Sequence, residues 1–427
     1  MPNPLQQRVS LRARFVIPVE QSPIAGGTLT VRGEQILEVG QAAPDDDVLD
    51  LGSMAILPAF INTHTHLEFS QLDQPLGYPG MPFSDWIRAV LKYREQQTET
   101  SEIAVSQGLA ESAAVGTAAL GEIVTYPLNR RHAENSHVHT VCFHELIGLS
   151  TERVQQQCER AHQMATELNA TTDAPSGLSP HAPYTAHRHL VSTVTQLSAD
   201  HGVPVAMHLA ETREEIQLLM SQSGPLHELL VERNVWQPQA FTPGIRPLDY
   251  LHLLAQANHT LIIHGNFLDE EEMRFIGTQR NRMTVVYCPR THAYFQHPEY
   301  PLRTLLDAKI RVVLGTDSRA SNPDLQMLSE MRCVAKRHSQ VSAKEILRMG
   351  TMDGAMALGV ENSLGSLAPG KQASFVAVQL PTSTESAPEH LVLDHELPIE
   401  LVVLKGQIIF ASDSTRAIIG KVFPVPS

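Results

Sequence analysis

Short apolar runs recur through the central part of the chain, and helical patterns separate them. The runs show little of the apolar–polar alternation of a strand with one solvated face, which is typical of parallel strands buried on both faces. Helical periodicity lies between them, for example over residues 101–114, 191–201 and 269–277. The predicted strands are residues 55–62, 117–123, 139–144, 176–179, 203–209, 261–264, 284–288 and 311–316. Eight such strands alternating with helices predict an α/β fold, a TIM-type (β/α)8 barrel.

The two ends of the chain carry a different pattern. Alternating runs punctuated by glycine, such as residues 28–31 and 35–39, predict antiparallel strands near the N-terminus. Runs at 374–378, 401–404 and 407–410 predict similar strands near the C-terminus. We therefore expect one small β-sandwich built from residues 1–55 and 363–427, with the barrel formed by residues 56–362.

Composition limits the partners and the compartment. The chain has 427 residues, of which 42% are hydrophobic and 18% charged, so a large core is available. The net charge of −14 argues against binding to nucleic acid or to an anionic membrane. No apolar stretch reaches the roughly 20 residues of a membrane span, and no signal peptide is evident. The four cysteines are widely spaced, as in a reduced protein, so we expect a cytoplasmic location.

Histidines are frequent, and their context distinguishes them. Among 21 histidines, roughly one His-x-His pair is expected by chance. Three such pairs occur, at residues 64 and 66, 137 and 139, and 187 and 189. Only His64 and His66 leave the end of a predicted barrel strand, and residues two apart on a strand face the same side. Both imidazoles can therefore reach one metal ion, whereas the other pairs are expected to be solvated or core histidines.

Further polar residues follow later strands in the same way. His208 lies near the end of the fifth predicted strand and Glu211 follows it, His264 ends the sixth, and Asp317 comes at the end of the eighth. Each alone could be an ordinary capping or core residue. Together they predict an active site at the carboxyl end of the barrel, where such enzymes carry their chemistry. Imidazole and carboxylate groups there indicate hydrolysis by metal-activated water.

With these residues identified, the chain resembles the amidohydrolase superfamily, in its mononuclear branch of deaminases and triazine hydrolases. The motifs that carry the resemblance are Pro58-Ala-Phe-Ile-Asn-Thr-His-Thr-His66, His208-Leu-Ala-Glu211, Ile263-His-Gly265, Cys288-Pro-Arg290 and Gly315-Thr-Asp-Ser318. Binuclear members bridge their metals with a modified lysine on strand four, and no lysine is found there. The resemblance therefore implies a single ion. Two departures are Ser374, where relatives usually carry Asp, and His292, where many carry Asn.

The resemblance implies a role for each of these residues. His64, His66, His208 and Asp317 would bind one divalent metal, most simply Zn²⁺, although Fe²⁺ and Mn²⁺ also accept these donors. Asp317 would accept a proton from the attacking water, and His264 would stabilise the developing charge. Glu211 would protonate a ring nitrogen of the substrate. The implied reaction is hydrolytic deamination of a heteroaromatic ring, and the same set would displace chloride from a chlorotriazine.

Several other residues are candidates for substrate binding. By the same resemblance, His181 would contact a purine or ribose, or else be a loop histidine. Trp86 would wall the pocket or lie in the core. Glu95, nine residues after Trp86, stands where adenosine-type members carry a glutamate for the ribose diol, although a solvated helix glutamate is the ordinary alternative. His292 bears on substrate choice.

Arginines near the predicted strand ends are candidates to bind a substrate carboxylate in bidentate fashion. Arg290 and Arg319 follow strands seven and eight, and Arg130 and Arg131 lie after strand two.

The substrate is expected to be a small heteroaromatic molecule. The stretches His66-Leu-Glu-Phe-Ser70 and Phe83-Ser-Asp-Trp86 resemble aminodeoxyfutalosine deaminases, whose substrate joins adenine, ribose and a benzoate. Guanine-type, methylthioadenosine-type and triazine substrates remain open, as do a cyclic amide and a metal-binding scaffold without activity. Related enzymes are often dimers or larger, so a homodimer is one of the states the resemblance allows.

Overall fold

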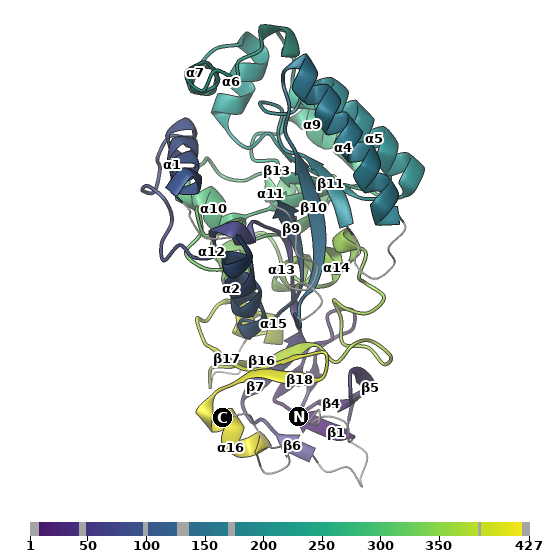
Figure 1. Cartoon of the computed structure of the whole chain (residues 1–427). Coiled ribbons are helices and arrows are strands. Elements are labelled where there is room, and N and C mark those ends of the chain that lie inside the picture. Colours follow the sequence, from purple (N-terminus) through teal and green to yellow (C-terminus); the bar gives the residue numbers. More distant parts are fainter. Residues whose placement is uncertain are drawn as a thin grey trace.

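The computed structural model describes residues 8–41, 48–96, 101–125, 136–169, 176–382 and 386–420. Within these residues, a barrel of strands and helices lies above two smaller sheets. Those sheets hold both the first and the last strands of the chain (Figure 1).

The barrel consists of eight strands in their order along the chain, from β8 to β15. Neighbouring strands pair in parallel throughout. Their bounds are β8 Phe60–Thr65, β9 Thr117–Val124, β10 His139–Leu146, β11 Ser176–Pro180, β12 Val205–Leu209, β13 Thr260–His264, β14 Met283–Tyr287 and β15 Arg311–Leu314. The prediction of a (β/α)8 barrel with a small β-sandwich from both termini is confirmed.

The first and last barrel strands meet and close the barrel. The Thr63 hydroxyl donates to the Leu314 carbonyl at 2.8 Å, and the Asp317 amide donates to the His64 carbonyl at 3.0 Å. Gly315 permits this approach, because a Cβ at that position would lie 2.9 Å from the Cβ of His64. The closure thus places the polar residues after β15 beside those of β8.

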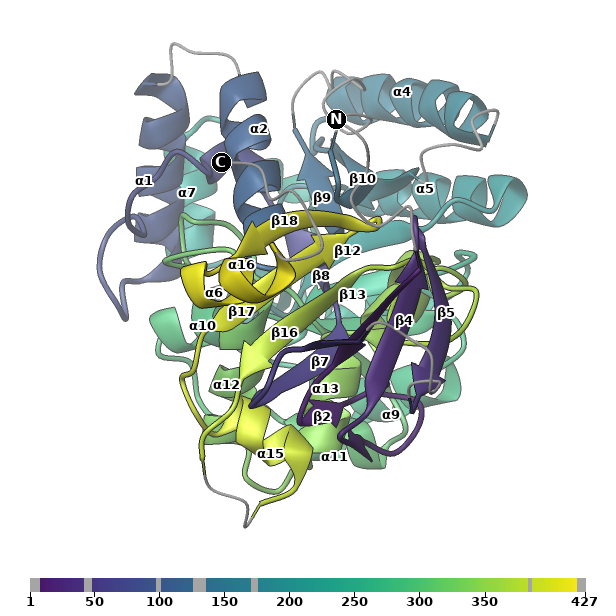
Figure 2. The same ribbon diagram turned by 90° about the horizontal axis from the view of Figure 1, so that it is seen from below.

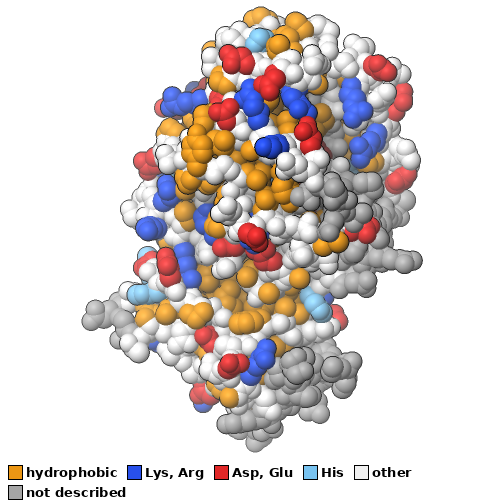
Figure 3. Space-filling model, turned by 60° about the vertical axis from the view of Figure 1, so that its left-hand side comes forward, with side chains coloured by type: hydrophobic (Ala, Val, Ile, Leu, Met, Phe, Trp, Pro, Cys, Tyr) orange, Lys and Arg blue, Asp and Glu red, His pale blue; other side chains and the backbone are white. Residues whose placement is uncertain are grey.

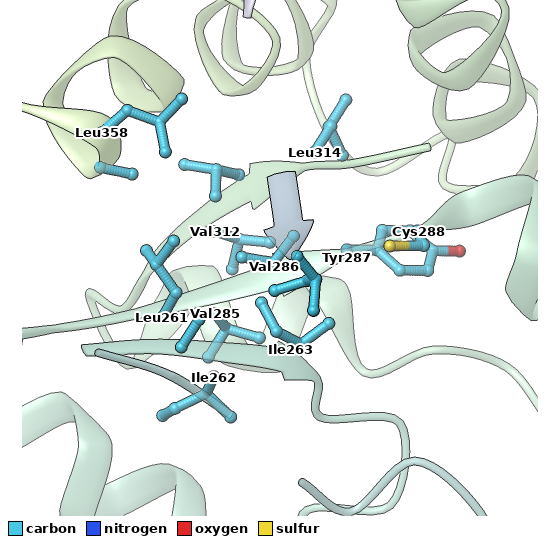
Figure 4. Packing of buried hydrophobic residues seen from close by; sticks show 14 of the residues in the cluster. Leu261, Ile262, Ile263, Val285, Val286, Tyr287, Cys288, Val312, Leu314 and Leu358 are labelled. Carbon is cyan, nitrogen blue, oxygen red and sulfur yellow. The ribbon is translucent and has the colours of Figure 1, made fainter. Parts of the chain in front are cut away.

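The barrel core explains why the strands read as continuous apolar runs. Residues 261–263 of β13, residues 285–286 of β14 and Val312 of β15 pack side by side, with Leu358 from a covering helix (Figure 4). All of them are buried, on whichever side of the sheet they point. Strands buried on both faces need apolar residues at every position, so alternation is lost.

Helices cover the outside of the barrel and line its upper end. The predicted helix at 101–114 coincides with α2. The helices that cover the strands are α2 Ser101–Ala114, α4 Thr151–Asn169, α5 Arg188–His201, α8 Pro247–Leu254, α9 Glu270–Thr278, α11 Leu302–Asp307, α12 Met327–Arg337, α13 Ala343–Met349 and α14 Met352–Leu358. Those in the longer connections are η2 Leu67–Phe69, α1 Phe83–Gln96, α6 Arg213–Ser221, α7 Pro225–Glu232, η3 Pro238–Ala240 and α10 Pro289–Tyr294. Among the described residues, none of these helices has both the length and the hydrophobicity that crossing a bilayer requires.

The two smaller sheets are built from the two ends of the chain, and Figure 2 shows them from below. One sheet contains β1 Val9–Arg12, β4 Thr28–Arg32, β5 Gln35–Gly40 and β6 Val48–Asp50. The other contains β2 Phe15–Val16, β3 Ile24–Ala25, β7 Met54–Pro58, β16 Phe375–Gln379, β17 Ile399–Leu404 and β18 Gln407–Ala411. The C-terminal part also carries α15 Pro388–Leu393 and α16 Asp413–Ile419. Within the second sheet β16 pairs with β7, so strands from opposite ends of the sequence are neighbours.

The first predicted barrel strand, 55–62, is corrected by the structure. Its apolar run spans two strands: β7 belongs to the sandwich and β8 to the barrel, with Ala59 between them. Both are buried, so the pattern of burial does not reveal the change of sheet. The domain boundary expected after residue 55 falls within β7.

Candidate active site

Three histidines from two barrel strands converge at the carboxyl end of the barrel. His64 lies in β8, His66 directly follows the end of that strand, and His208 comes from β12. One nitrogen from each of the three rings lies within 4.8 Å of the other two. This arrangement brings together the donors that sequence analysis assigned to one ion.

Asp317 adds a carboxylate to this cluster from the segment after β15. Its Oδ1 lies 3.5 Å from His64 Nε2 and 3.6 Å from His66 Nε2. The Ser321 hydroxyl donates to the other carboxylate oxygen at 2.9 Å. The backbone of Asp317 has a φ of 56°, in the left-handed region that non-glycine residues rarely adopt. Strain of this kind is concentrated at functional sites.

The chemistry of the cluster fits a divalent metal. His64 is fully buried, and neither of its ring nitrogens has a hydrogen-bond partner in the described part of the chain. The Nδ1 of His208 lies 3.1 Å from the carbonyl of His181, so its Nε2 is left available to an ion. Burial lowers the pKa of His66 and of His208 well below the usual value, which keeps both rings neutral. Neutral imidazoles with one carboxylate are donors that Zn²⁺ and Fe²⁺ accept.

A carboxyl and an imidazole lie beside the cluster. Glu211 follows β12, and its Oε1 is 3.4 Å from Nε2 of His264, the last residue of β13. The amides of Ala210 and Glu211 donate to the Glu215 carboxylate at 2.8 and 2.9 Å, which fixes this turn. Burial raises the pKa of Glu211 well above its usual value, and the charges of Asp317 and Glu215 add to the effect. A buried carboxyl of this kind is suited to donate a proton.

His264 is held in a strained conformation by its neighbours. Its φ is 70°, and the Tyr300 hydroxyl donates to its carbonyl at 3.0 Å. Burial lowers the pKa of His264 to about 3, so the ring is neutral near pH 7. A neutral imidazole fixed beside the cluster can donate a hydrogen bond without bringing a charge into the site.

The side chains of His66, His208, Asp317, Glu211 and His264 line a cavity of about 360 Å³. Trp86 is part of its wall, stacked on Phe83, with its indole N–H donating to the Ala320 carbonyl at 3.0 Å. His181 also lines it, with Nδ1 2.6 Å from the Thr185 hydroxyl. Much of the remaining wall is apolar and comes from η2, α1 and α7, namely Phe69, Ile87, Val90, Leu226, Leu229 and Leu230. A view of the side that carries α1 shows apolar side chains gathered among charged ones (Figure 3).

The arginines predicted to bind a carboxylate are engaged elsewhere. Arg290 forms ion pairs with Asp324 at 2.5 Å and Glu330 at 2.6 Å. Arg319 pairs with Glu111 at 2.9 Å and donates to the Leu72 carbonyl at 2.7 Å. Neither arginine lines the cavity, and both guanidinium groups are bound to carboxylates of the protein. Arg130 and Arg131 lie outside the described residues.

Two further predicted residues also lie away from the cavity wall. Glu95 has a side chain that is 62% exposed, and it pairs with Arg233 at 3.1 Å. His292 is buried against the rings of Tyr287 and Tyr300. The structure therefore brings His181 and Trp86 to the cavity with the cluster, but not Glu95 or His292.

Sequence analysis missed several groups that line the cavity. Glu145 lies at the end of β10, and its position after a strand was a signal that could have found it. Arg94 and Arg233 come from α1 and from the end of α7. Along α7, the cavity-lining residues recur at the spacing of one helix face, at positions 226, 229, 230 and 233. This periodicity could have revealed that α7 forms part of the cavity wall.

Comparison with known proteins places the chain in a family and agrees with the fold. The model of the amidohydrolase family matches residues 55–409. A 5-methylthioadenosine/S-adenosylhomocysteine deaminase from Pyrococcus furiosus is 27% identical over 82% of this chain and 82% of its own. An aminodeoxyfutalosine deaminase from Nitratiruptor sp. is 27% identical over 82% of this chain and 86% of its own.

A solved structure shares the fold over most of the chain. The Helicobacter pylori aminofutalosine deaminase, in complex with methylthio-coformycin, superposes with a TM-score of 0.79 at 23% identity. The match covers 94% of this chain and 100% of that one. The family model spans most of the chain, so the resemblance inferred from the strand-end motifs is confirmed: the chain belongs to the amidohydrolase family.

Proposed function

We propose that the protein is a metal-dependent deaminase that hydrolyses the 6-amino group of a 5′-substituted adenosine, with aminodeoxyfutalosine as the favoured substrate. The observation that carries the proposal is the convergence of three histidines and Asp317 beside the Glu211–His264 pair, at the wall of a largely apolar cavity. A flat heteroaromatic ring with an apolar substituent suits such a cavity.

The class of enzyme rests on more than the geometry. The amidohydrolase family and the deaminases among the relatives confirm the prediction of a hydrolytic deaminase. Relatives named for methylthioadenosine, S-adenosylhomocysteine and aminodeoxyfutalosine support an adenosine derivative as the substrate. The motifs after His66 and around Trp86 favour aminodeoxyfutalosine among them.

Four residues would hold the metal: His64, His66, His208 and Asp317. A bound Zn²⁺ would supply a Lewis acid that lowers the pKa of water to near neutrality. Asp317 lies at the cluster through Oδ1 and would take the proton that water loses on attack.

The Glu211–His264 pair would act on the substrate. Attack at the amine-bearing carbon places negative charge on the adjacent ring nitrogen, and proton donation by Glu211 neutralises that charge. His264, 3.4 Å from Glu211, would donate a hydrogen bond to the oxygen added at that carbon. The amine then takes up a proton and leaves as ammonia, giving the inosine-type product.

The test is ammonia release by zinc-loaded protein from a panel of substrates. The panel contains aminodeoxyfutalosine, methylthioadenosine, S-adenosylhomocysteine, adenosine, guanine and cytosine, and a chlorotriazine scored by chloride release. We expect activity on the 5′-substituted adenosines, highest on aminodeoxyfutalosine. Activity confined to guanine or the chlorotriazine would refute the proposed substrate class, and preference for methylthioadenosine would refute the favoured substrate alone.

A further inference from the structure

Glu145 is a buried carboxylate that the proposed chemistry does not use. It is the second-to-last residue of β10 and it lines the cavity, with a side chain that is only 6% exposed. The imidazole of His181 lies beside it, with Nε2 3.9 Å from Glu145 Oε1, which is too far for a hydrogen bond. The described part of the chain gives this carboxylate no hydrogen bond.

Other buried glutamates near the site accept hydrogen bonds from backbone amides. Glu215 accepts from the amides of residues 210 and 211, and Glu122 accepts from the Leu67 amide through both of its oxygens. A buried carboxylate without such donors carries a desolvation penalty. Burial accordingly raises the pKa of Glu145 to about 7. Donors from a bound molecule would remove this penalty.

The position of Glu145 indicates which part of a substrate it meets. The ring centroids of His208 and His181 lie 5.0 Å apart. Glu145 lies beside His181, 3.9 Å from its Nε2. The carboxylate is therefore separated from the metal-binding cluster by one side chain. A molecule that reacts at the cluster would bring to Glu145 the group attached to its ring, and not the reacting carbon.

The charges around Glu145 favour a neutral donor over a cation. Arg94 lies near enough to favour the ionised form of Glu145, while its guanidinium is bonded to Glu68 at 2.7 and 3.2 Å. A cationic substrate group would face Arg94 at close range, whereas a hydroxyl group would not be repelled. Two adjacent hydroxyls can donate one hydrogen bond to each carboxylate oxygen.

We infer that Glu145 accepts hydrogen bonds from the two vicinal hydroxyls of the sugar attached to the reacting ring, and so selects ribonucleosides. The inference rests on the proposed function, because it takes the substrate to be a nucleoside. It gives Glu145 the task that sequence analysis assigned to Glu95. The side chain of Glu95 is mostly exposed to solvent and does not line the cavity, although its partner Arg233 does.

The experiment measures binding without turnover. In zinc-loaded protein carrying Glu211→Gln, calorimetry gives the Kd of adenosine and of 2′,3′-dideoxyadenosine, with and without Glu145→Gln. We expect the second substitution to weaken adenosine binding roughly 10- to 100-fold, as for a hydrogen bond to a charged group. Binding of the dideoxy compound, which has no hydroxyls to lose, should change less than about 3-fold by the same reasoning. The matched variant Glu95→Gln should leave both values within the same limit.

The alternative outcomes separate this inference from the proposed function. Equal weakening of both nucleosides by Glu145→Gln, or selective weakening by Glu95→Gln, would overturn the role of Glu145. If unsubstituted protein released no ammonia from adenosine compounds but the discrimination persisted, the proposed function would fail and the assignment of Glu145 would stand. Absence of binding by either nucleoside would overturn both. Glu145→Asp, which keeps the charge, provides a second variant should Glu145→Gln lower the melting temperature.

Discussion

At the scale of single residues, the site combines reacting groups with neighbours that hold them in place. Asp317 is fixed by Ser321, His208 by the carbonyl of His181, and His264 by the Tyr300 hydroxyl. Such supporting contacts keep the reacting atoms within the narrow range of positions that catalysis requires. Removing a reacting group and removing its support should therefore give different results.

Replacing Glu211 by glutamine tests the proton donor. The metal donors are untouched, so Glu211→Gln should retain full metal content. Ammonia release should fall by roughly 10²- to 10⁴-fold, the usual contribution of general acid catalysis. Elemental analysis and an ammonia assay on the same sample measure both. A metal-loaded variant with unchanged activity would contradict the role of Glu211.

Replacing Ser321 by alanine tests the support of Asp317. The lost hydrogen bond leaves one carboxylate oxygen free to reorient, so we expect metal affinity to fall roughly 10- to 100-fold. Competition with a chromogenic chelator measures this change. Ser414→Ala, an exposed serine on α16 in the other part of the molecule, is the matched control and should have no effect. Equal affinity in both variants would show that Asp317 needs no such support.

At the scale of elements, the site depends on how closely β15 approaches β8. The two strands come from distant parts of the sequence, and the hydrogen bond from Asp317 to the His64 carbonyl ties them together. Gly315 lies against His64, where a methyl group would have no room. One residue thus controls both the closure of the barrel and the distance between two metal-binding groups.

Adding a methyl group at this contact should disturb stability and metal binding together. Gly315→Ala should lower stability by roughly 1–3 kcal/mol, as for overpacking of a dense core, and should reduce metal content. Gly359→Ala is a control for backbone strain alone, because Gly359 has a φ of 71° but open space around it. That control should cost about 1 kcal/mol and leave metal content unchanged. Thermal melting and elemental analysis distinguish the two cases, and full metal content in Gly315→Ala would contradict this account.

At the scale of the whole molecule, a metal held by residues from three strands or their ends should stabilise the entire barrel. A ligand that binds only the folded state adds about 4 kcal/mol when present at 1,000 times its Kd. We therefore expect chelation to lower the melting temperature by several degrees, reversibly on addition of Zn²⁺. His208→Ala should melt at the same temperature with and without chelator. A chelator-induced shift that persists in His208→Ala would place the stabilising metal elsewhere.

Much of the barrel could be predicted, because parallel strands buried on both faces leave short apolar runs. The apolar runs that end at Met207 and Ile263 marked two of these strands. The polar residue directly after each run, His208 or His264, belongs to the site. The boundary between β7 and β8 could not be predicted, because one continuous run of buried residues contributes a strand to each of two sheets.

Contacts between distant residues also escaped prediction. Arg319 follows a strand as a substrate-binding arginine would, but Glu111, which neutralises it, lies 208 positions away in the sequence. Glu145 belongs to no quoted motif, and its place directly after the predicted strand 139–144 was its one signal in the sequence.

The direct passage from β7 into β8 has a consequence for the order of events during synthesis. β8 carries His64 and leads directly to His66, and it follows β7, whose neighbour β16 is synthesised more than three hundred residues later. A nascent chain still missing residues 375–379 can contain every reacting group and yet lack the partner that anchors their strand. We therefore expect metal acquisition to follow the synthesis of β16, so a strand without a single reacting group decides when the site can form.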